Sequence, residues 1–205
     1  MERKEIRAFN FEVRAEENDK GKVLTGTPIV ANEPTDMGWY KEVIESKALL
    51  DADLRDVRFL VNHNTDMIPL ARSRNNNENS TMQLSITDNG DMDIRVNLDT
   101  ENNSESKSLY SAVERGDISG MSFMFSVAED KWEDIDTDYP TRHILKISKV
   151  FEVSAVTFPA YEATSIQARG LGEALESAKS SLESVRAEKR EIERKKQKIR
   201  ILMEV

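Results

Sequence analysis

The chain has 205 residues, with 38 Asp or Glu against 29 Lys or Arg and a formal net charge of −9. A nucleic-acid binder needs a basic face to neutralise phosphates, so this charge balance argues against that class. The absence of cysteine excludes disulfides and cysteine-ligated metals, which leaves oxygen or lysine nucleophiles and favours an intracellular setting. No apolar run reaches the roughly 20 residues of a membrane-spanning helix, and the first ten residues lack a signal-peptide core, so no membrane association or export is expected.

Apolar residues recur with a period of two over most of residues 1–170, which is the pattern of half-buried strands. Residues 9–13 and 57–61 are two such strands. The clearest case is the pair 82–86 and 92–98, which flanks the segment TDNGD. Asn-Gly tolerates the positive φ angles of a tight turn, so this pair predicts a β-hairpin.

Helical patterns are fewer. Residues 46–55 predict a short helix, and residues 104–117 predict a second one with Ser104 as its cap and Gly116 as its stop. Residues 142–158 follow as one or two further strands. Many strands with few helices predict a mainly β protein (α+β) with peripheral helices around a closed or nearly closed β-barrel.

The last 35 residues differ from the rest. They contain no proline, and their apolar residues follow alternating steps of four and three, which is a heptad seam weakened by Lys189 and Lys196. The pattern predicts an amphipathic helix that docks on a partner or forms a short coiled coil; a helix folded back on its own domain is the alternative. We therefore expect a β-barrel domain over residues 1–170 and a C-terminal helical tail over residues 171–205.

Three polar residues stand within apolar strands or directly after one. His63 comes just after the strand ending at residue 61, Ser122 lies in GDISGMSFMF, and Glu152 lies in FEVSAVTF. The carboxylate of Glu152 in an apolar strand needs a partner. This partner could be His63, or it could be Lys149 or an arginine in an ordinary structural ion pair. Each of these residues taken alone is more commonly structural than catalytic.

Taken in order, FLVNHNT, GDISGMSFMF and FEVSAVTFPAYEATS resemble the prohead, or capsid maturation, serine proteases of tailed bacteriophages, which are related in fold to the herpesvirus assemblins. The resemblance covers about residues 5–168 and includes GTPIVANEP and YKEVIESKAL. It implies an antiparallel barrel of the assemblin type, a Ser122 nucleophile, a His63 general base and a Glu152 that orients the histidine. These roles are chemically consistent, because a serine hydroxyl needs an imidazole to take its proton and a carboxylate stabilises the charged imidazole.

Two points of the resemblance stay open. Assemblins use a second histidine as the third catalytic residue, so His143 competes with Glu152 for that role. The segment PAYEATSIQARG has no close match to the assemblin loop that supplies oxyanion donors, so backbone amides are the expected donors. The acidic DNGDMD is better explained as a hairpin turn than as a calcium loop, and we expect no cofactor and no metal.

The resemblance also implies substrates and partners. The implied substrates are the scaffold portion of the major capsid protein, other internal scaffold proteins and the protease itself. The protease is also expected to self-associate and to lie inside the immature prohead in the host cytoplasm. Two other classes remain open. The chain could be an inactive relative that acts as a scaffold or assembly factor through its tail, or a small β-barrel binding module whose Ser, His and Glu merely sit in the core.

Overall fold

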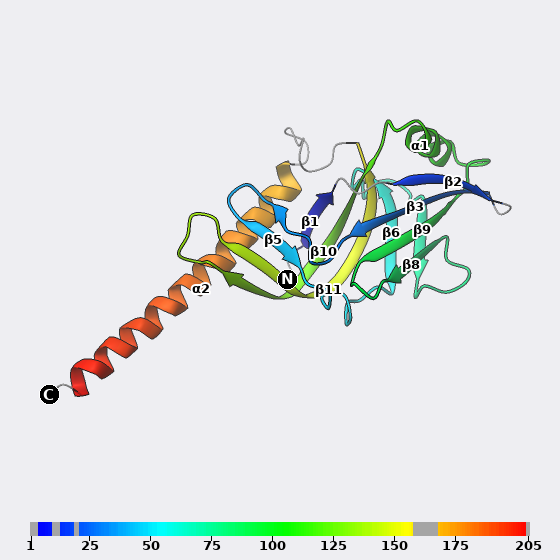
Figure 1. Cartoon of the computed structure of the whole chain (residues 1–205). Coiled ribbons are helices and arrows are strands. Elements are labelled where there is room, and N and C mark those ends of the chain that lie inside the picture. The colour runs from blue at the N-terminus through cyan, green and yellow to red at the C-terminus, as the bar shows by residue number, and fades with distance from the viewer. Residues whose placement is uncertain (1–3, 10–12, 19–20, 158–167, 204–205) are drawn as a thin grey trace.

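The computed structural model describes residues 4–9, 13–18, 21–157 and 168–203. These residues form a mainly β structure with two helices, one of them long and C-terminal (Figure 1). The strands are β1 (Lys4–Phe9), β2 (Arg14–Asn18), β3 (Gly21–Ile29), β4 (Thr35–Asp36), β5 (Lys41–Ile44), β6 (Asp56–Val61), β7 (Ala71–Arg74), β8 (Met82–Ile86), β9 (Met92–Leu98), β10 (Gly120–Glu133) and β11 (Thr141–Val156). The helices are α1 (Ser104–Glu114) and α2 (Ala168–Met203).

The strands fall into two sheets. A 7-stranded sheet follows the order β1-β10-β11-β5-β4, with β6 and β7 joined to it through β11, and a 4-stranded sheet follows the order β2-β3-β9-β8. The long strand β11 organises the larger sheet, because one edge pairs with β10 while the other pairs first with β5 and later with β6. A single strand thus covers the region predicted as one or two strands.

The prediction of a closed or nearly closed antiparallel β-barrel needs correction. No closed barrel is present among the described strands, and β11 runs parallel, not antiparallel, to β5 and β6. The physical reason is that period-two alternation shows which side chains face a core. It shows neither which strand lies next to it nor in which direction that strand runs, so closure and parallel pairing could not be predicted from it.

Apolar faces of the two sheets form a common core. The smaller sheet contributes Leu24, Met82, Met92, Ile94 and Val96, and the larger one contributes Phe59, Met121, Phe123, Val153 and Ala155. Met121 and Phe123 flank Ser122, so Ser122 points to the opposite face of β10 from this core. The alternation in β11 likewise places Glu152 and Ser154 on the face opposite Val153 and Ala155.

The predicted hairpin is confirmed. β8 and β9 pair antiparallel up to Ile86 opposite Met92. Gly90 in the connecting turn has φ +92°, and a Cβ built there would lie 2.2 Å from the carbonyl oxygen of Ser46. Glycine is therefore required at this position both for its backbone conformation and for space. The strand predicted at 57–61 is also confirmed, as β6.

The helix predicted at residues 46–55 is wrong. Hydrogen-bonded turns occupy residues 46–51, with Ala48 and Leu49 buried. The chain leaves β5 and within a few residues forms a bridge between Asp53 and Lys149 on β11. This short return leaves no length for a helix, so tertiary pairing overrides the local apolar pattern.

The second predicted helix is confirmed as α1, with a different cap. Asn103, rather than Ser104, precedes the helix, and its Oδ1 accepts hydrogen bonds from the backbone N–H groups of Glu105 at 2.9 Å and Ser106 at 3.2 Å. Gly116 follows the helix end with φ +79°, as predicted for a stop. The strand predicted at residues 9–13 is only partly described, because residues 10–12 lie outside the described part of the chain.

The first half of α2 packs on the rest of the chain, and its end extends away from it (Figure 1). Ala178 and Leu182 form a buried cluster with Tyr40 and Trp132, and the Trp132 Nε1–H donates to the Ser181 hydroxyl at 3.0 Å. In its first half, α2 therefore packs against the rest of the chain, which was the alternative to a helix that docks on a partner.

The apolar residues of the heptad pattern in the second half of α2 are exposed to solvent instead. Ile192 is 45% exposed, Ile199 is 57% exposed and Met203 is 82% exposed. Gly170 and Gly172 lie inside α2. The division into domains at residues 170 and 171 stays a prediction. Neither helix, over the residues that the structure describes, is long and apolar enough to cross a membrane.

Candidate active site

His63 lies on a tight turn at the end of β6. Asn62 and His63 have φ +52° and +56°, in the left-handed region where non-glycine residues are uncommon. The turn is fastened to the end of β11. Asn62 donates its backbone N–H to the carbonyl of Ala155 at 3.0 Å, and its side-chain amide accepts the Thr157 backbone N–H at 2.9 Å and donates to the Thr157 hydroxyl at 3.0 Å. The sheet thus fixes the backbone from which the imidazole projects.

Glu152 is the partner of this histidine. Its Oε1 lies 2.6 Å from His63 Nδ1, and the two side chains are 3% and 12% exposed. A carboxylate at Nδ1 favours the tautomer with its proton on that nitrogen, which leaves Nε2 as an acceptor. The Nε2 atom is buried and has no hydrogen-bond partner among the described residues. The alternative partner Lys149 instead lies 3.3 Å from Asp53.

Ser122 lies one strand away from this pair. It is directly opposite Ser154 in the β10–β11 register, which places the two Cβ atoms roughly 4.5–5.5 Å apart on one face. The Ser122 hydroxyl is fully buried and donates to the backbone carbonyl of Arg7 at 2.8 Å. No hydrogen bond joins Ser122 to His63 in the described structure. The Ser122 hydroxyl must therefore give up its bond to the Arg7 carbonyl before it can donate to another acceptor.

His143 lies in a different part of the molecule. Its Nδ1 is 2.7 Å from Glu45, and its Nε2 is 3.6 Å from Glu133. It precedes Glu152 on the extended strand β11 by nine residues, a separation of roughly 30 Å along the strand. The structure therefore places Glu152, and not His143, beside His63.

Sequence reasoning missed a further group of the site, Ser154. Its hydroxyl donates to Glu152 Oε2 at 2.5 Å and accepts the backbone N–H of His63 at 3.1 Å. The available signal was the strand parity, which puts Ser154 on the same face as Glu152. Parity could not show the contact with His63, because that contact depends on the parallel pairing of β6 with β11.

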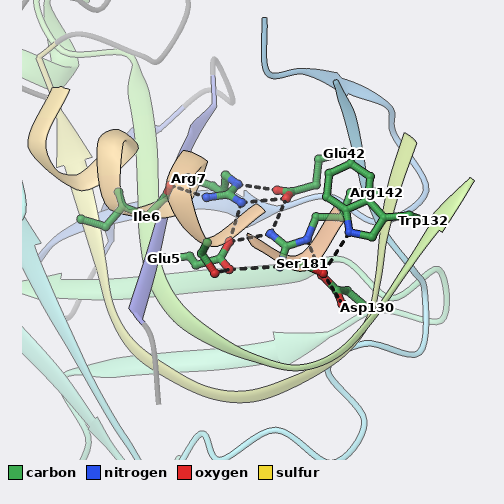
Figure 2. A network of polar contacts seen from close by, with 9 residues as sticks. Glu5, Ile6, Arg7, Glu42, Asp130, Trp132, Arg142 and Ser181 are labelled. Carbon is green, nitrogen blue, oxygen red and sulfur yellow. Dashed lines mark hydrogen bonds and ion pairs between the residues drawn. The ribbon is translucent and has the colours of Figure 1, made fainter. Parts of the chain in front are cut away.

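A buried network of charges lies on β1, β5, β10 and β11 (Figure 2). Arg7 Nη2 bonds Glu5 at 2.6 Å and Glu42 at 2.7 Å. Arg142 Nη1 bonds the same two carboxylates at 2.8 and 3.2 Å, and its Nε bonds Asp130 at 2.6 Å. Arg7, Glu5, Glu42 and Arg142 are all nearly inaccessible to solvent. The two buried guanidinium groups thus balance the two buried carboxylates, and the third carboxylate, Asp130, is 20% exposed, which makes burial of these charges tolerable.

Helix α2 contacts two carboxylates of this network. Ser177 donates to Glu5 at 3.2 Å, and Ser181 donates to Asp130 at 3.1 Å. β1, the strand that carries Glu5, also supplies the carbonyl that accepts the Ser122 hydroxyl. The C-terminal helix, the charge network and the strand beside Ser122 are therefore physically connected.

The network predicts acid sensitivity. Burial raises the pKa of Glu5, but Arg7 and Arg142 outweigh it and hold that pKa below its ordinary value of 4.5. Because the pKa is lower in the folded state than in the unfolded state, Glu5 contributes stability above pH 4.5 and loses it as the pH falls through the folded-state value. Urea unfolding between pH 7 and pH 3 is expected to show a fall in stability that is smaller in Glu5→Gln. The exposed control Glu101→Gln is expected to follow the wild type, and an unchanged pH dependence in Glu5→Gln would contradict the assignment.

Other features lie outside the site. A hollow of about 830 Å³ lies on the four-stranded sheet and is lined by residues that include Thr25, Asp93 and Arg95; none of Ser122, His63 and Glu152 lines it. Within the described ranges, no group of three or more His, Asp or Glu side chains is placed to hold a metal ion.

Comparison with known proteins identifies the family. Residues 9–178 match the family model described as Caudovirus prohead serine protease. This match spans most of the chain, so the protein belongs to a family of serine proteases. The family is that of the phage prohead proteases, which take part in capsid maturation.

A solved structure and a search of curated proteins complete the comparison. The chain is similar to the bacteriophage T4 capsid assembly protease, gp21, with 14% sequence identity over 76% of this chain and 99% of that chain and a TM-score of 0.41. No curated protein matches.

Proposed function

We propose that this protein is a serine endopeptidase with a Ser-His-Glu triad. Its substrates are the scaffold portion of the major capsid protein, internal scaffold proteins and its own chain during prohead maturation. The observation that carries the proposal is the contact between His63, at the end of β6, and Glu152 on β11, with Ser122 on β10, the other neighbour of β11 in this part of the sheet. Membership of the prohead protease family supports the choice of substrate class.

The proposed reaction is acyl transfer. The Ser122 hydroxyl turns from the Arg7 carbonyl toward His63, whose Nε2 takes the proton as the serine oxygen bonds to the peptide carbonyl carbon. His63 then returns the proton to the leaving amine as the C–N bond breaks. Water attacks the resulting ester with the same proton transfers and releases the acid. Glu152 stabilises the charged imidazole during both steps, and backbone amides are proposed to stabilise the oxyanion.

Burial of the site fits this chemistry. Glu152 is almost inaccessible to solvent, and a carboxylate in a low-dielectric site interacts more strongly with an imidazolium than an exposed one does. The same burial means that a substrate must displace whatever covers Ser122. Membership of the prohead protease family supports the proposed partners, which are the capsid protein and its scaffold region, together with further copies of the protease at the high local concentration inside a prohead.

The test is co-expression of the full chain with the capsid protein of the same phage. Wild-type protease is expected to convert the capsid protein to a shorter product that lacks its scaffold portion, whereas Ser122→Ala leaves it whole. His143→Gln serves as the matched control, because it removes the other histidine at a distance from Glu152. Intact capsid protein with the wild type, in assembled proheads, would contradict the proposal.

A second candidate function is that of an assembly factor without catalysis. Two observations favour it: the exposed apolar seam at the end of α2, and the Ser122 hydroxyl that donates to Arg7 instead of His63. The same co-expression separates the two functions. Normal prohead assembly with no Ser122-dependent cleavage at any stage would favour the assembly factor.

A further inference from the structure

A single buried hydroxyl contacts both members of the His63–Glu152 pair. Ser154 lies on β11, is fully buried, and takes no part in the proton transfers proposed above. It donates to Glu152 Oε2 at 2.5 Å and accepts from the His63 backbone N–H at 3.1 Å. A hydroxyl has one proton to donate and lone pairs to accept with, so these two bonds use its donor and one acceptor site.

The bond to Glu152 fixes the orientation of the carboxylate. His63 Nδ1 contacts Oε1, and Ser154 contacts Oε2, so the two oxygens have separate partners on two sides. The χ3 torsion angle, which orients the carboxylate of glutamate, has a broad and roughly two-fold distribution when nothing restrains it. With Ser154 in place, the carboxylate plane is set, and a buried oxygen with no other donor among the described residues is satisfied.

The bond to His63 fixes the backbone of the turn. The left-handed conformation of His63 persists only when surrounding contacts hold it. Ser154 supplies the acceptor for its N–H, and the neighbouring residue Asn62 is held by Ala155 and Thr157. The consecutive residues Ser154 and Ala155 of β11 thus hold the consecutive residues His63 and Asn62 of the turn.

We infer that Ser154 is a positioning residue, which aligns the His63 imidazole and the Glu152 carboxylate through one hydroxyl. The role of the aligned pair in catalysis rests on the proposed function. The alignment itself is a property of the fold, and it can be measured without any substrate.

The test compares four full-length variants with the wild type: Ser154→Ala, Ser154→Thr, Ser154→Val and Ser126→Ala. Thr keeps the hydroxyl and Val is its near-isostere without one, so this pair isolates the hydroxyl even if the Ala variant does not fold. Ser126 is another fully buried serine, whose hydroxyl bonds Ser148 instead of the His63–Glu152 pair, and it measures the general cost of deleting a buried hydroxyl.

Two readouts are used. Imidazole ¹⁵N spectra, recorded in a His143→Gln background that leaves one histidine, report which ring nitrogen carries the proton. The wild type, Ser154→Thr and Ser126→Ala are expected to keep it on Nδ1, and the Val and Ala variants are expected to show a mixture. The rate of Ser122 labelling by a fluorophosphonate probe is expected to fall by about 10- to 100-fold in the Val and Ala variants and to recover in Thr, because misplacement by about 1 Å costs that much.

The outcomes separate the two claims. Wild-type labelling rate and tautomer in the Val variant would overturn the role of Ser154. So would a slower rate with an unchanged tautomer that Thr does not restore, since that is the result of a merely structural serine. Absence of any Ser122 labelling in the wild type would instead count against the proposed function, and the ¹⁵N spectra would still decide whether Ser154 aligns the pair.

Discussion

Replacement of Ser122 by alanine is expected to abolish covalent labelling of the protein by a fluorophosphonate probe. Loss of the buried bond to the Arg7 carbonyl is expected to lower the free energy of unfolding by about 1–3 kcal/mol. The wild type is expected to carry the label on Ser122 alone, because only a serine activated by a neighbouring base reacts readily. His63→Gln and Glu152→Gln are expected to slow labelling by about 10³-fold or more, as in other serine hydrolases in which the base or its orienting carboxylate is removed. Labelling is quantified by intact mass, and the site is identified by peptide mapping.

The control for the histidine is His143→Gln. His143 bonds Glu45 and lies far from Glu152 along β11, so its removal is expected to leave the labelling rate within twofold of the wild type. A label on a serine other than Ser122 would contradict the assignment of the nucleophile. Labelling that survives in His63→Gln at the wild-type rate would contradict the assignment of the base.

Removal of one partner from the buried charge network is expected to have the largest effect on stability. Arg7→Met keeps much of the side-chain volume but leaves Glu42 and Glu5 with a single guanidinium between them. An uncompensated buried carboxylate costs about 3–5 kcal/mol, so the free energy of unfolding in urea is expected to fall by about that amount. The variant retains the backbone carbonyl that accepts the Ser122 hydroxyl, which limits the direct effect on the candidate site.

The matched control is Arg55→Met. Arg55 bonds Asp53 in a bidentate geometry, but its side chain is 78% exposed, so water replaces the lost contact and the unfolding midpoint is expected to stay close to that of the wild type. Equal midpoints for Arg7→Met and Arg55→Met would show that burial of the network does not contribute as described.

Local features of the fold were predictable from the sequence because their causes are local. The hairpin of β8 and β9 depends on alternation and on a turn with Gly90, and α1 depends on an apolar face and on Gly116. The helix predicted at residues 46–55 was wrong because a bridge to Lys149 decides that segment from about 100 residues away. Strand order and parallel pairing were not predictable for the same reason.

The candidate site divides in a similar way. Ser122 and Glu152 stood out within apolar strands and His63 just after one, and the family resemblance connected the three residues. The role of Ser154 was not readable, because a serine beside a glutamate on a strand shows nothing of a turn contributed by β6. The contact of Ser122 with Arg7 was hidden as well, since its acceptor is a backbone carbonyl that every residue has.

The charge network was only partly visible. Glu5 and Arg7 share one face of β1 by alternation, but their burial depends on Glu42, Arg142 and helix α2, which come from distant parts of the chain. Paired charges on a short strand near a terminus are usually solvated. Only the assembled sheet shows that these charges lie in the interior.

The central claim is that the protein hydrolyses peptide bonds with Ser122. The most direct measurement is the intact mass of the purified full-length chain and of Ser122→Ala, incubated side by side at high protein concentration, alone and with the capsid protein. The account predicts that the wild type cleaves its own chain and loses mass, while Ser122→Ala keeps its full mass. Equal masses in both samples, with the capsid protein present and also intact, would contradict it.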